Sequence, residues 1–391
     1  MMKHFIVFIF LVLSSTVFSQ NDEKIIILKD AETQQPIEDA TVLVVKTKQM
    51  VLSNSEGKVS FLLKGTSNIQ ITHTSYVSQT LRSSTLKEKI NVVFLKNNVN
   101  NLEEIIITKQ HPQKILISLI ENSKKALTVP ARLKVYSREF FKLNGVYSYY
   151  NDGIMNFQLF DKTKKFNSNI LVEQNRSVGL LEKNISADLL GYNLNDIMEN
   201  YYNFKYLNLL LDPKAKKEFE FLIRVYSANK ELYSMTVIPS AINKNLVDDF
   251  TIIYDPKKKM IIEVSSVLAP STMAKFEDKT AVGSKNIFKS NFKAMYRIEG
   301  TFYYLVSSKE EIGFDKIEKE GSKSIEVRNY FVTTNFSNQN YIYKESEVFK
   351  DKTLFNKHNV ILTDFWNNSG LDTTEEEQEI INSIEDLIYD K

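Results

Sequence analysis

The chain has 391 residues, of which 43% are hydrophobic and 25% are charged, and its 50 basic and 48 acidic side chains leave a net charge of +2. This near balance gives no overall field that would attract nucleic acid. The absence of cysteine excludes a disulfide framework, a thiolate metal site and a cysteine nucleophile. The length predicts two domains, and the 25 Phe and 19 Tyr favour strands over helices.

Residues 1–19 have the pattern of a secretory signal peptide. Lys3 precedes an apolar run over residues 5–13, and the small residue Ser19 closes the segment. The run is shorter than the roughly 20 residues of a membrane-spanning helix, and no later stretch predicts a transmembrane span. We expect cleavage before Gln20 and export to the periplasm or outer membrane, with the cell surface or the medium as further destinations. The alternative is a buried N-terminal strand.

Residues 22–97 predict a β-sandwich. Turn-forming residues separate short apolar runs at residues 24–28, 41–45, 59–63, 69–72 and 90–95. Several short strands at this spacing are typical of two packed antiparallel sheets. Gly57 can adopt the positive φ that closes the turn over residues 54–57.

The same stretch resembles a known family. The residues that carry the likeness are Pro36-Ile37-Glu38-Asp39-Ala40 before a strand, Ser53-Asn54-Ser55-Glu56-Gly57 in a turn, and Thr72-His73-Thr74-Ser75-Tyr76 at a strand end. In this pattern the chain resembles the carboxypeptidase regulatory-like domain of Bacteroidota envelope proteins. The resemblance implies a Greek-key-type sandwich of seven strands, an accessory module without peptidase activity. Family members usually carry Gly where Asp39 and Ser75 stand, so two expected tight turns depart from the family pattern.

Residues 98–130 are interpreted as a linker that contains one strand and one helix. The strand segment consists of Leu102, Glu103, Glu104, Ile105, Ile106, Ile107 and Thr108, and it resembles the TonB box that follows this domain in outer-membrane receptors. Because a free β-branched strand can add to the edge of another sheet, it is a candidate partner-binding strand. A last strand or a stiff linker is the simpler interpretation. Apolar residues at 115, 116, 119, 120 and 127 then predict a helix that connects the domains.

Residues 131–370 predict a larger antiparallel β domain. Aromatic and β-branched runs cover residues 140–150, 219–226, 233–238, 302–306 and 341–343, with a short helix near residues 194–198. The clearest feature is a hairpin that pairs residues 250–254 with 260–264 around Pro256. Residues 132–150 also resemble a segment found downstream in a subgroup of the same envelope proteins, which has no assigned chemistry.

Residues 371–391 predict an acidic amphipathic helix. Thr373 and Glu376 have the spacing of a capping box. The apolar stripe consists of Ile380, Ile381, Ile384, Leu387 and Ile388. Such a stripe indicates a terminal helix that docks on its own domain, with a partner-binding helix as the alternative.

No residue set predicts catalysis, a cofactor or a metal. Beyond the leader, His73, His111 and His358 lie far apart without metal-ligand spacing. The sequence also has no Gly-x-Ser-x-Gly elbow and no glycine-rich phosphate loop. Arg138 and Glu139 lie next to each other in a strand, so they point to opposite faces, and one of them is expected in a structural ion pair with a distant partner.

Clustered tyrosines could form either a sugar-stacking platform or the β core, and we favour the core. They are Tyr147, Tyr149, Tyr150, Tyr201, Tyr202, Tyr303 and Tyr304. The leading hypothesis is a non-enzymatic cell-envelope binding or structural module whose partner is an envelope protein or glycan. The rivals are an accessory component of a TonB-dependent outer-membrane uptake system and a peptide or glycan hydrolase.

Overall fold

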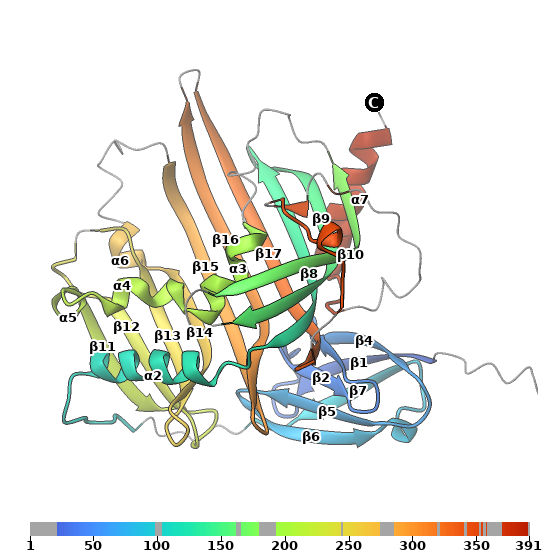
Figure 1. The fold of residues 1–391 in the computed structure, drawn as a ribbon, viewed down its shortest axis with the longest axis horizontal. Helices are drawn as coiled ribbons and strands as arrows, with labels where there is room; N and C mark the ends of the chain where they lie inside the picture. The colour runs from blue at the N-terminus through green and yellow to red at the C-terminus, as the bar shows by residue number, and fades with distance from the viewer. Residues whose placement is uncertain are drawn as a thin grey trace, which may run out of the picture.

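The computed structural model describes residues 22–97, 104–161, 166–179, 193–243, 245–273, 285–318, 321–339, 342–351, 353–354, 357 and 370–389 (Figure 1). The predicted signal peptide over residues 1–19 lies outside the described residues, as do Leu102, Glu103, Tyr341 and His358. The architecture is mostly β, as predicted, with a small sandwich, one large antiparallel sheet and a C-terminal helix.

Seven strands form the sandwich. They are β1 (Asp22–Asp30), β2 (Thr41–Val44), β3 (Gln49–Leu52), β4 (Lys58–Leu63), β5 (Asn68–His73), β6 (Tyr76–Arg82) and β7 (Ile90–Leu95), with a short 3-10 helix η1 (Ser83–Thr85) before the last. One sheet has the order β4-β1-β7 and the other β3-β2-β5-β6. Every second residue of β1 is buried, so Ile26 and Leu28 join Phe61 and Ile71 in the core between the sheets.

The turns at the two positions without glycine form in different ways. Asp39 has a φ of 64°, in the left-handed region that Gly usually supplies and that Asp tolerates better than most residues. Ser75 instead donates its backbone N–H to His73 Nδ1 at 3.0 Å, which closes the β5–β6 turn. The sandwich therefore keeps both turns without the glycines.

The larger domain is built on a ten-stranded antiparallel sheet of order β10-β9-β8-β17-β16-β15-β14-β13-β12-β11. Its strands are β8 (Ala131–Leu143), β9 (Val146–Asp161), β10 (Asn167–Gly179), β11 (Phe219–Val225), β12 (Tyr233–Pro239), β13 (Asp248–Asp255), β14 (Met260–Leu268), β15 (Lys285–Glu299), β16 (Phe302–Glu318) and β17 (Gly321–Ser337). The predicted hairpin is confirmed as β13–β14, where Phe250 pairs with Ser266 and Ile252 with Val264.

The run predicted over residues 140–150 is not one strand. It contains the turn between β8 and β9, where Asn144 and Gly145 have φ values of 50° and 83°. Positive φ at both central residues is the geometry that an Asn-Gly pair favours in a two-residue hairpin. The predicted run at residues 341–343 forms no strand at the described Ile342 and Tyr343.

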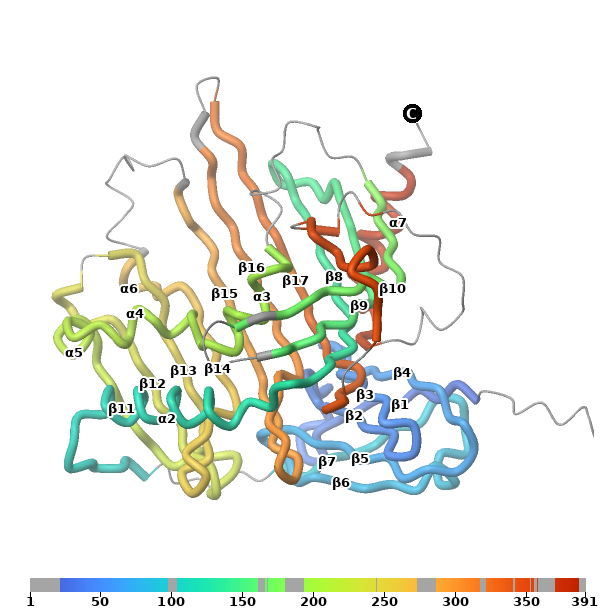
Figure 2. The backbone as a smooth tube through the Cα atoms, in the orientation of Figure 1, coloured from blue at the N-terminus to red at the C-terminus, as the bar shows by residue number. Residues whose placement is uncertain are grey.

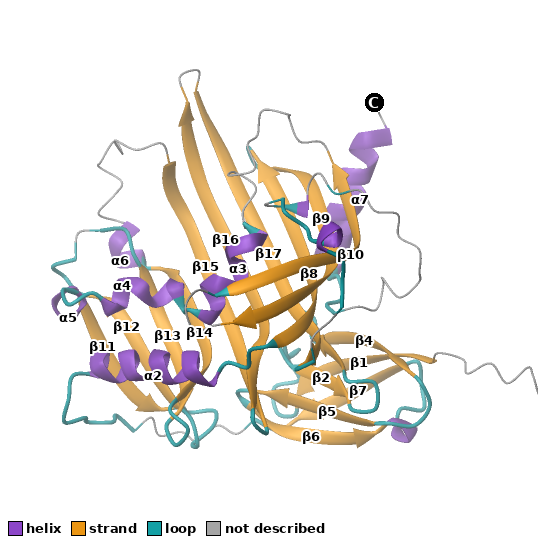
Figure 3. Cartoon of the chain, in the orientation of Figure 1, coloured by secondary structure: helices purple, strands orange, loops and turns teal. Residues whose placement is uncertain are grey.

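Helices cover one face of the large sheet, which we call the inner face (Figure 3). They are α2 (Pro112–Ala126), α3 (Leu194–Tyr202), η3 (Lys205–Leu207), α4 (Asn208–Leu211) and α5 (Ala215–Glu218). Because β10 and β11 are the two edges of the sheet, the chain between them must cross its whole width, and α3 to α5 do so. Helix α2, which was predicted as a connection, packs with Leu116, Leu119 and Ile120 in this core. The remaining short helices are α6 (Pro270–Met273) and η4 (Glu345–Glu347).

The opposite, outer face of the large sheet carries the sandwich and helix α7 (Glu375–Tyr389). In Figure 2 the red segment before α7 lies against the blue strands of the sandwich. The predicted docking of this helix on its own domain is confirmed, because Ile380, Ile381 and Ile384 pack with Phe140 and Tyr150. The side chains of Leu387 and Ile388 lie outside the described residues.

The capping box was predicted one residue too early. Thr374, not Thr373, accepts from Glu377 N–H at 3.1 Å, and Thr374 N–H donates to Glu377 Oε2 at 3.2 Å. Glu377 is therefore the carboxylate of the capping box, and it also accepts a hydrogen bond from Arg138, as described below.

Candidate functional site

The junction between the sandwich and the outer face has an apolar centre. Met50 of β3 packs with Tyr304 and Val306 of β16, and Leu52 packs with Met295 and Val332. Buried apolar contact of this kind holds the two domains together without directional bonds. Three clefts open around this centre, and each is lined by described residues of both domains.

The first, the charged cleft, has a volume of about 200 Å³. Lys293 bridges it, with its Nζ 2.8 Å from Asp39 Oδ2 of the sandwich and 3.5 Å from Glu263 Oε1 of the sheet. Burial alone would lower the pKa of Lys293, but Glu263 and Asp39 outweigh it and raise that pKa above its ordinary value. The left-handed turn at Asp39 thus delivers a carboxylate to the junction.

A second ion-pair group in the charged cleft centres on Glu311. Its carboxylate lies 2.7 Å from Lys289 Nζ, 3.5 Å from Arg328 Nε and 3.8 Å from Lys309 Nζ, and Lys309 Nζ in turn lies 3.4 Å from Glu38 Oε1. Desolvation would raise the pKa of Glu311, but the surrounding cations hold it below its ordinary value. The charges of this cleft are therefore matched to one another.

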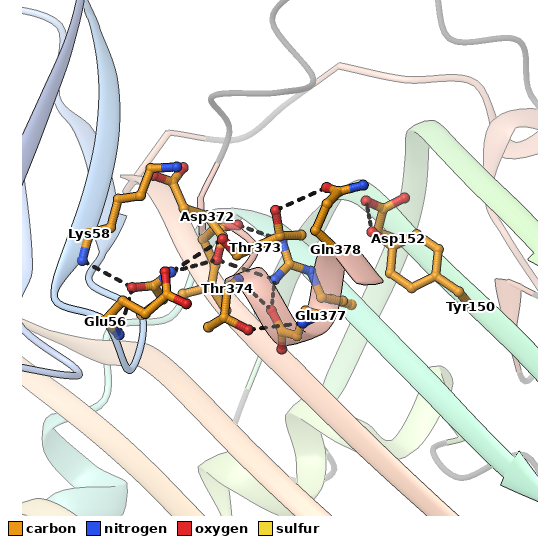
Figure 4. Close-up of polar contacts among 12 residues, drawn as sticks. Glu56, Lys58, Tyr150, Asp152, Asp372, Thr373, Thr374, Glu377 and Gln378 are labelled. Carbon is orange, nitrogen blue, oxygen red and sulfur yellow. Dashed lines mark hydrogen bonds and ion pairs between the residues drawn. The ribbon is translucent and has the colours of Figure 1, made fainter. Parts of the chain in front are cut away.

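Residues 370–374, which we call the clasp, pass between the two domains (Figure 4). Leu52 N–H donates to Gly370 O at 2.9 Å, and Ser60 Oγ donates to Asp372 Oδ2 at 2.6 Å. On the other side Arg138 donates to Leu371 O at 2.6 Å. The clasp thus bonds β3 and β4 of the sandwich on one side and β8 of the large sheet on the other.

Arg138 has the distant partner that its place in the sequence predicted. It is only 3% exposed and donates to Glu377 Oε2 at 2.8 Å and to Tyr136 Oη at 3.0 Å. Tyr136 then donates to Asp152 Oδ2 at 3.1 Å, and Arg176 bonds the same carboxylate at 2.9 Å. Figure 4 shows Asp152 and Tyr150 on the strand beside the start of α7. The network pairs each buried charge, as buried ions require.

Glu139 faces the inner side of the same strand, next to a cavity of about 30 Å³. Its neighbours across the sheet are the buried side chains of Asn151 and Asn329. Burial raises the pKa of Glu139 to about 8, and no cation within the described part of the chain forms an ion pair with it. The cavity has room for about one water, so this carboxyl adjoins little open space.

The second cleft, which we call the arginine cleft, has a volume of about 390 Å³ and lies between β2 and β5 of the sandwich and β15 of the sheet. The third has about 370 Å³ and lies beside Phe302 and Phe336, and it shares Glu299 with the arginine cleft. Both volumes fall in the range of small-molecule sites, about 300–1,000 Å³, whereas the charged cleft falls below it. These two clefts are therefore the candidate binding sites.

The two described histidines have structural roles. Burial and the nearby Lys293 lower the pKa of His73 to about 4, and its Nδ1 closes the turn at Ser75. His111 Nδ1 accepts from Gln113 N–H at 3.2 Å and so caps α2. Within the described ranges, no three His, Cys, Asp or Glu side chains are grouped so that they could hold a metal ion.

The clustered tyrosines lie mostly in the core, which confirms the favoured interpretation. Six of them, Tyr149, Tyr150, Tyr201, Tyr202, Tyr303 and Tyr304, are each 3% exposed or less. Tyr147 is half-buried. Rings that are enclosed in this way cannot stack on a ligand from solvent.

The candidate partner-binding strand is described from Glu104 onward. Ile106 N–H donates to Ile223 O at 2.9 Å and Val225 N–H donates to Glu104 O at 3.0 Å, so residues 104–106 extend the sheet at β11. The side chains of Ile105 and Ile107 are 59% and 94% exposed. The segment therefore pairs its backbone within the chain and presents two apolar side chains to solvent.

No family model matches the chain, and no curated protein shows a significant match. Among solved structures, a LolA superfamily protein from Nitrosomonas europaea is 8% identical over 60% of this chain and 97% of its own, with a TM-score of 0.24. A lipovitellin structure, described as showing lipid–protein interactions, is 11% identical over 55% of this chain, with a TM-score of 0.24. The match covers 26% of the lipovitellin chain, about a quarter of its length. A putative membrane-associated protein of unknown function from Bacteroides fragilis is 8% identical over 80% of this chain and 97% of its own, with a TM-score of 0.16.

These scores and identities are too low to establish a shared fold. None of the described helices is both long enough and apolar enough to cross a membrane.

Proposed function

We propose that the protein is a non-enzymatic binding module of the bacterial cell envelope whose ligand site lies at the sandwich–sheet junction. The observation that carries the proposal is the arginine cleft, a hollow of about 390 Å³ between two domains that the clasp and the apolar centre hold in place. A site between rigidly joined domains is preorganised, which reduces the entropy lost on binding. The leader pattern over residues 1–19 supports export to the envelope.

The state of the carboxyl groups supports binding over hydrolysis. A hydrolase needs an acid or base beside space for its substrate, yet Glu139, whose pKa is raised to about 8, adjoins a cavity of about 30 Å³. The carboxylates Asp39 and Glu311 of the junction are already paired with Lys293 and Lys289.

Co-sedimentation with peptidoglycan sacculi and with outer-membrane vesicles tests the proposal. We expect the protein to be retained by one fraction without release of reducing sugar or free amines. Gln70→Trp, at an exposed position lining the arginine cleft, should reduce retention, whereas Arg82→Trp, at an exposed position outside it, should not. Substrate turnover, or retention that Gln70→Trp leaves unchanged, would contradict the proposal.

The exposed Ile105 and Ile107 favour a second candidate function, an accessory role in a TonB-dependent uptake system. Residues 104–106 lie at the β11 edge of the sheet, and an extended segment at a sheet edge fits strand addition to a partner. Deletion of residues 102–108 would then reduce TonB-dependent uptake. Unchanged uptake in the deletion strain would contradict this second candidate function.

A further inference from the structure

The arginine cleft combines an apolar surface, to which Leu232, Ile262 and Ile298 contribute, with neutral hydrogen-bonding side chains. From the sandwich come Gln70, Thr72, Thr74 and Ser78, and Asn229 comes from the turn between β11 and β12. Amides and hydroxyls both donate and accept hydrogen bonds. They suit a ligand that carries many hydroxyl groups.

One cation stands among these neutral groups. Arg297 donates to Thr72 Oγ1 at 2.5 Å, contacts Met50 Sδ at 3.7 Å and hydrogen-bonds Tyr304, and no carboxylate among the described residues lies within 4.0 Å of it. A guanidinium has five N–H donors, so these three contacts leave about two of them for another partner.

The carboxylates that line the same cleft have partners other than Arg297. Asp39 is paired with Lys293 at 2.8 Å, and Glu299 accepts from Tyr304 Oη at 2.9 Å. Arg297 therefore differs from Arg138, Arg176 and Arg328, each of which lies within 4.0 Å of a carboxylate.

We propose that the arginine cleft binds an acidic saccharide, with the carboxylate of a uronic acid on Arg297 and its hydroxyls on the Gln, Thr, Ser and Asn side chains around it. This inference rests on the proposed function and names its ligand class. A single cation matches the single charge of a carboxylate, and the guanidinium fork can hold both of its oxygens. A phosphate would gather more positive charge than one half-buried arginine supplies, and no lysine is among the described residues that line this cleft.

Calorimetric titration of the full chain with di- and trigalacturonic acid tests the inference, with galactobiose and galactotriose as neutral counterparts. We expect the acidic sugars to bind and the neutral ones to bind about 10- to 100-fold more weakly, as loss of one charged hydrogen-bonded pair implies. Arg297→Gln should weaken acidic-sugar binding by the same factor, and the matched Arg82→Gln should leave it unchanged.

Two further variants keep the test sharp. Gln70→Ala, at an exposed position, should weaken binding several-fold even if Arg297→Gln lowers stability, and Arg297→Lys should restore part of the affinity. Equal binding of neutral sugars, an unaffected Arg297→Gln, or equally tight binding of plain acetate would each overturn the inference. Failure of every sugar to bind overturns it too, while retention by an envelope fraction would leave the proposed function standing.

Discussion

Arg138 and Glu139 are consecutive residues of β8, and the strand sends their side chains to opposite faces of the sheet. On the outer face Arg138 has a carboxylate, a phenol and backbone carbonyls within hydrogen-bond distance. On the inner face the cross-strand neighbours of Glu139, Asn151 and Asn329, are neutral, and burial raises the pKa of Glu139 to about 8. The comparison shows that a buried side chain stays charged when ionic and hydrogen-bonding partners surround it. A buried carboxyl group without such partners is favoured in its neutral form.

The largest expected effect comes from breaking the outer-face network. Arg138→Ala removes the partner of Glu377 and leaves that carboxylate buried and uncompensated, at a cost of about 3–5 kcal/mol in the free energy of unfolding. Urea denaturation measures this change. Lys142→Ala, in the same strand as Arg138, removes a partly exposed ion pair with Glu326 of β17 and should cost less than about 1 kcal/mol. Equal losses in the free energy of unfolding of the two variants would contradict the larger stabilisation expected from the buried pair.

Glu139→Gln should act in the opposite direction on the inner face. Because the pKa of Glu139 is raised in the folded state, the folded protein binds the extra proton, and stability falls as pH rises from about 4.5 to about 8. The neutral amide removes this loss, so at pH 8 the variant should be more stable by about 2–3 kcal/mol, with little difference near pH 4. Denaturation curves across this pH range provide the measurement, and a wild-type curve parallel to that of the variant would contradict the raised pKa.

The smallest effect concerns the helix that carries Glu377. Thr374→Ala removes the side-chain cap of α7 and should cost about 1 kcal/mol. Its neighbour Thr373, which makes one exposed contact of 3.5 Å, serves as the matched control, and Thr373→Ala should stay within about 0.5 kcal/mol of wild type. Thermal unfolding measures both variants. A larger loss for Thr373→Ala than for Thr374→Ala would support the capping box at Thr373 and Glu376 that the sequence predicted.

Local pattern predicted much of the fold. The hairpin β13–β14, helix α2 and helix α7 have strong periodicity or turn chemistry, and each formed close to its expected bounds. Strand β3 has only four residues, and β6 has no buried residue, so neither shows the alternation by which a strand is recognised. The Asn144–Gly145 turn did have a signal, the Asn-Gly pair, which a continuous run of aromatic residues obscured.

The junction could not be predicted in the same way. Arg138 and Glu377 are 239 positions apart, and Arg297 meets Thr72 across 225. Such contacts depend on which face of the large sheet receives the sandwich, and periodicity within one strand carries no information about that choice. The sequence could indicate that Arg138 or Glu139 would be paired, because their alternation is local, but not with which residue.

The clasp has a consequence for the order of assembly. Residues 370–374 follow every described strand of the sandwich and of the large sheet in the chain, yet they bond β3 and β4 near its beginning. A chain that is synthesised from its N-terminus can fold the sandwich early, but the sandwich can be locked to the sheet only after these late residues emerge. The clefts at the junction are therefore completed last, and a truncated product would carry a folded sandwich without a finished junction.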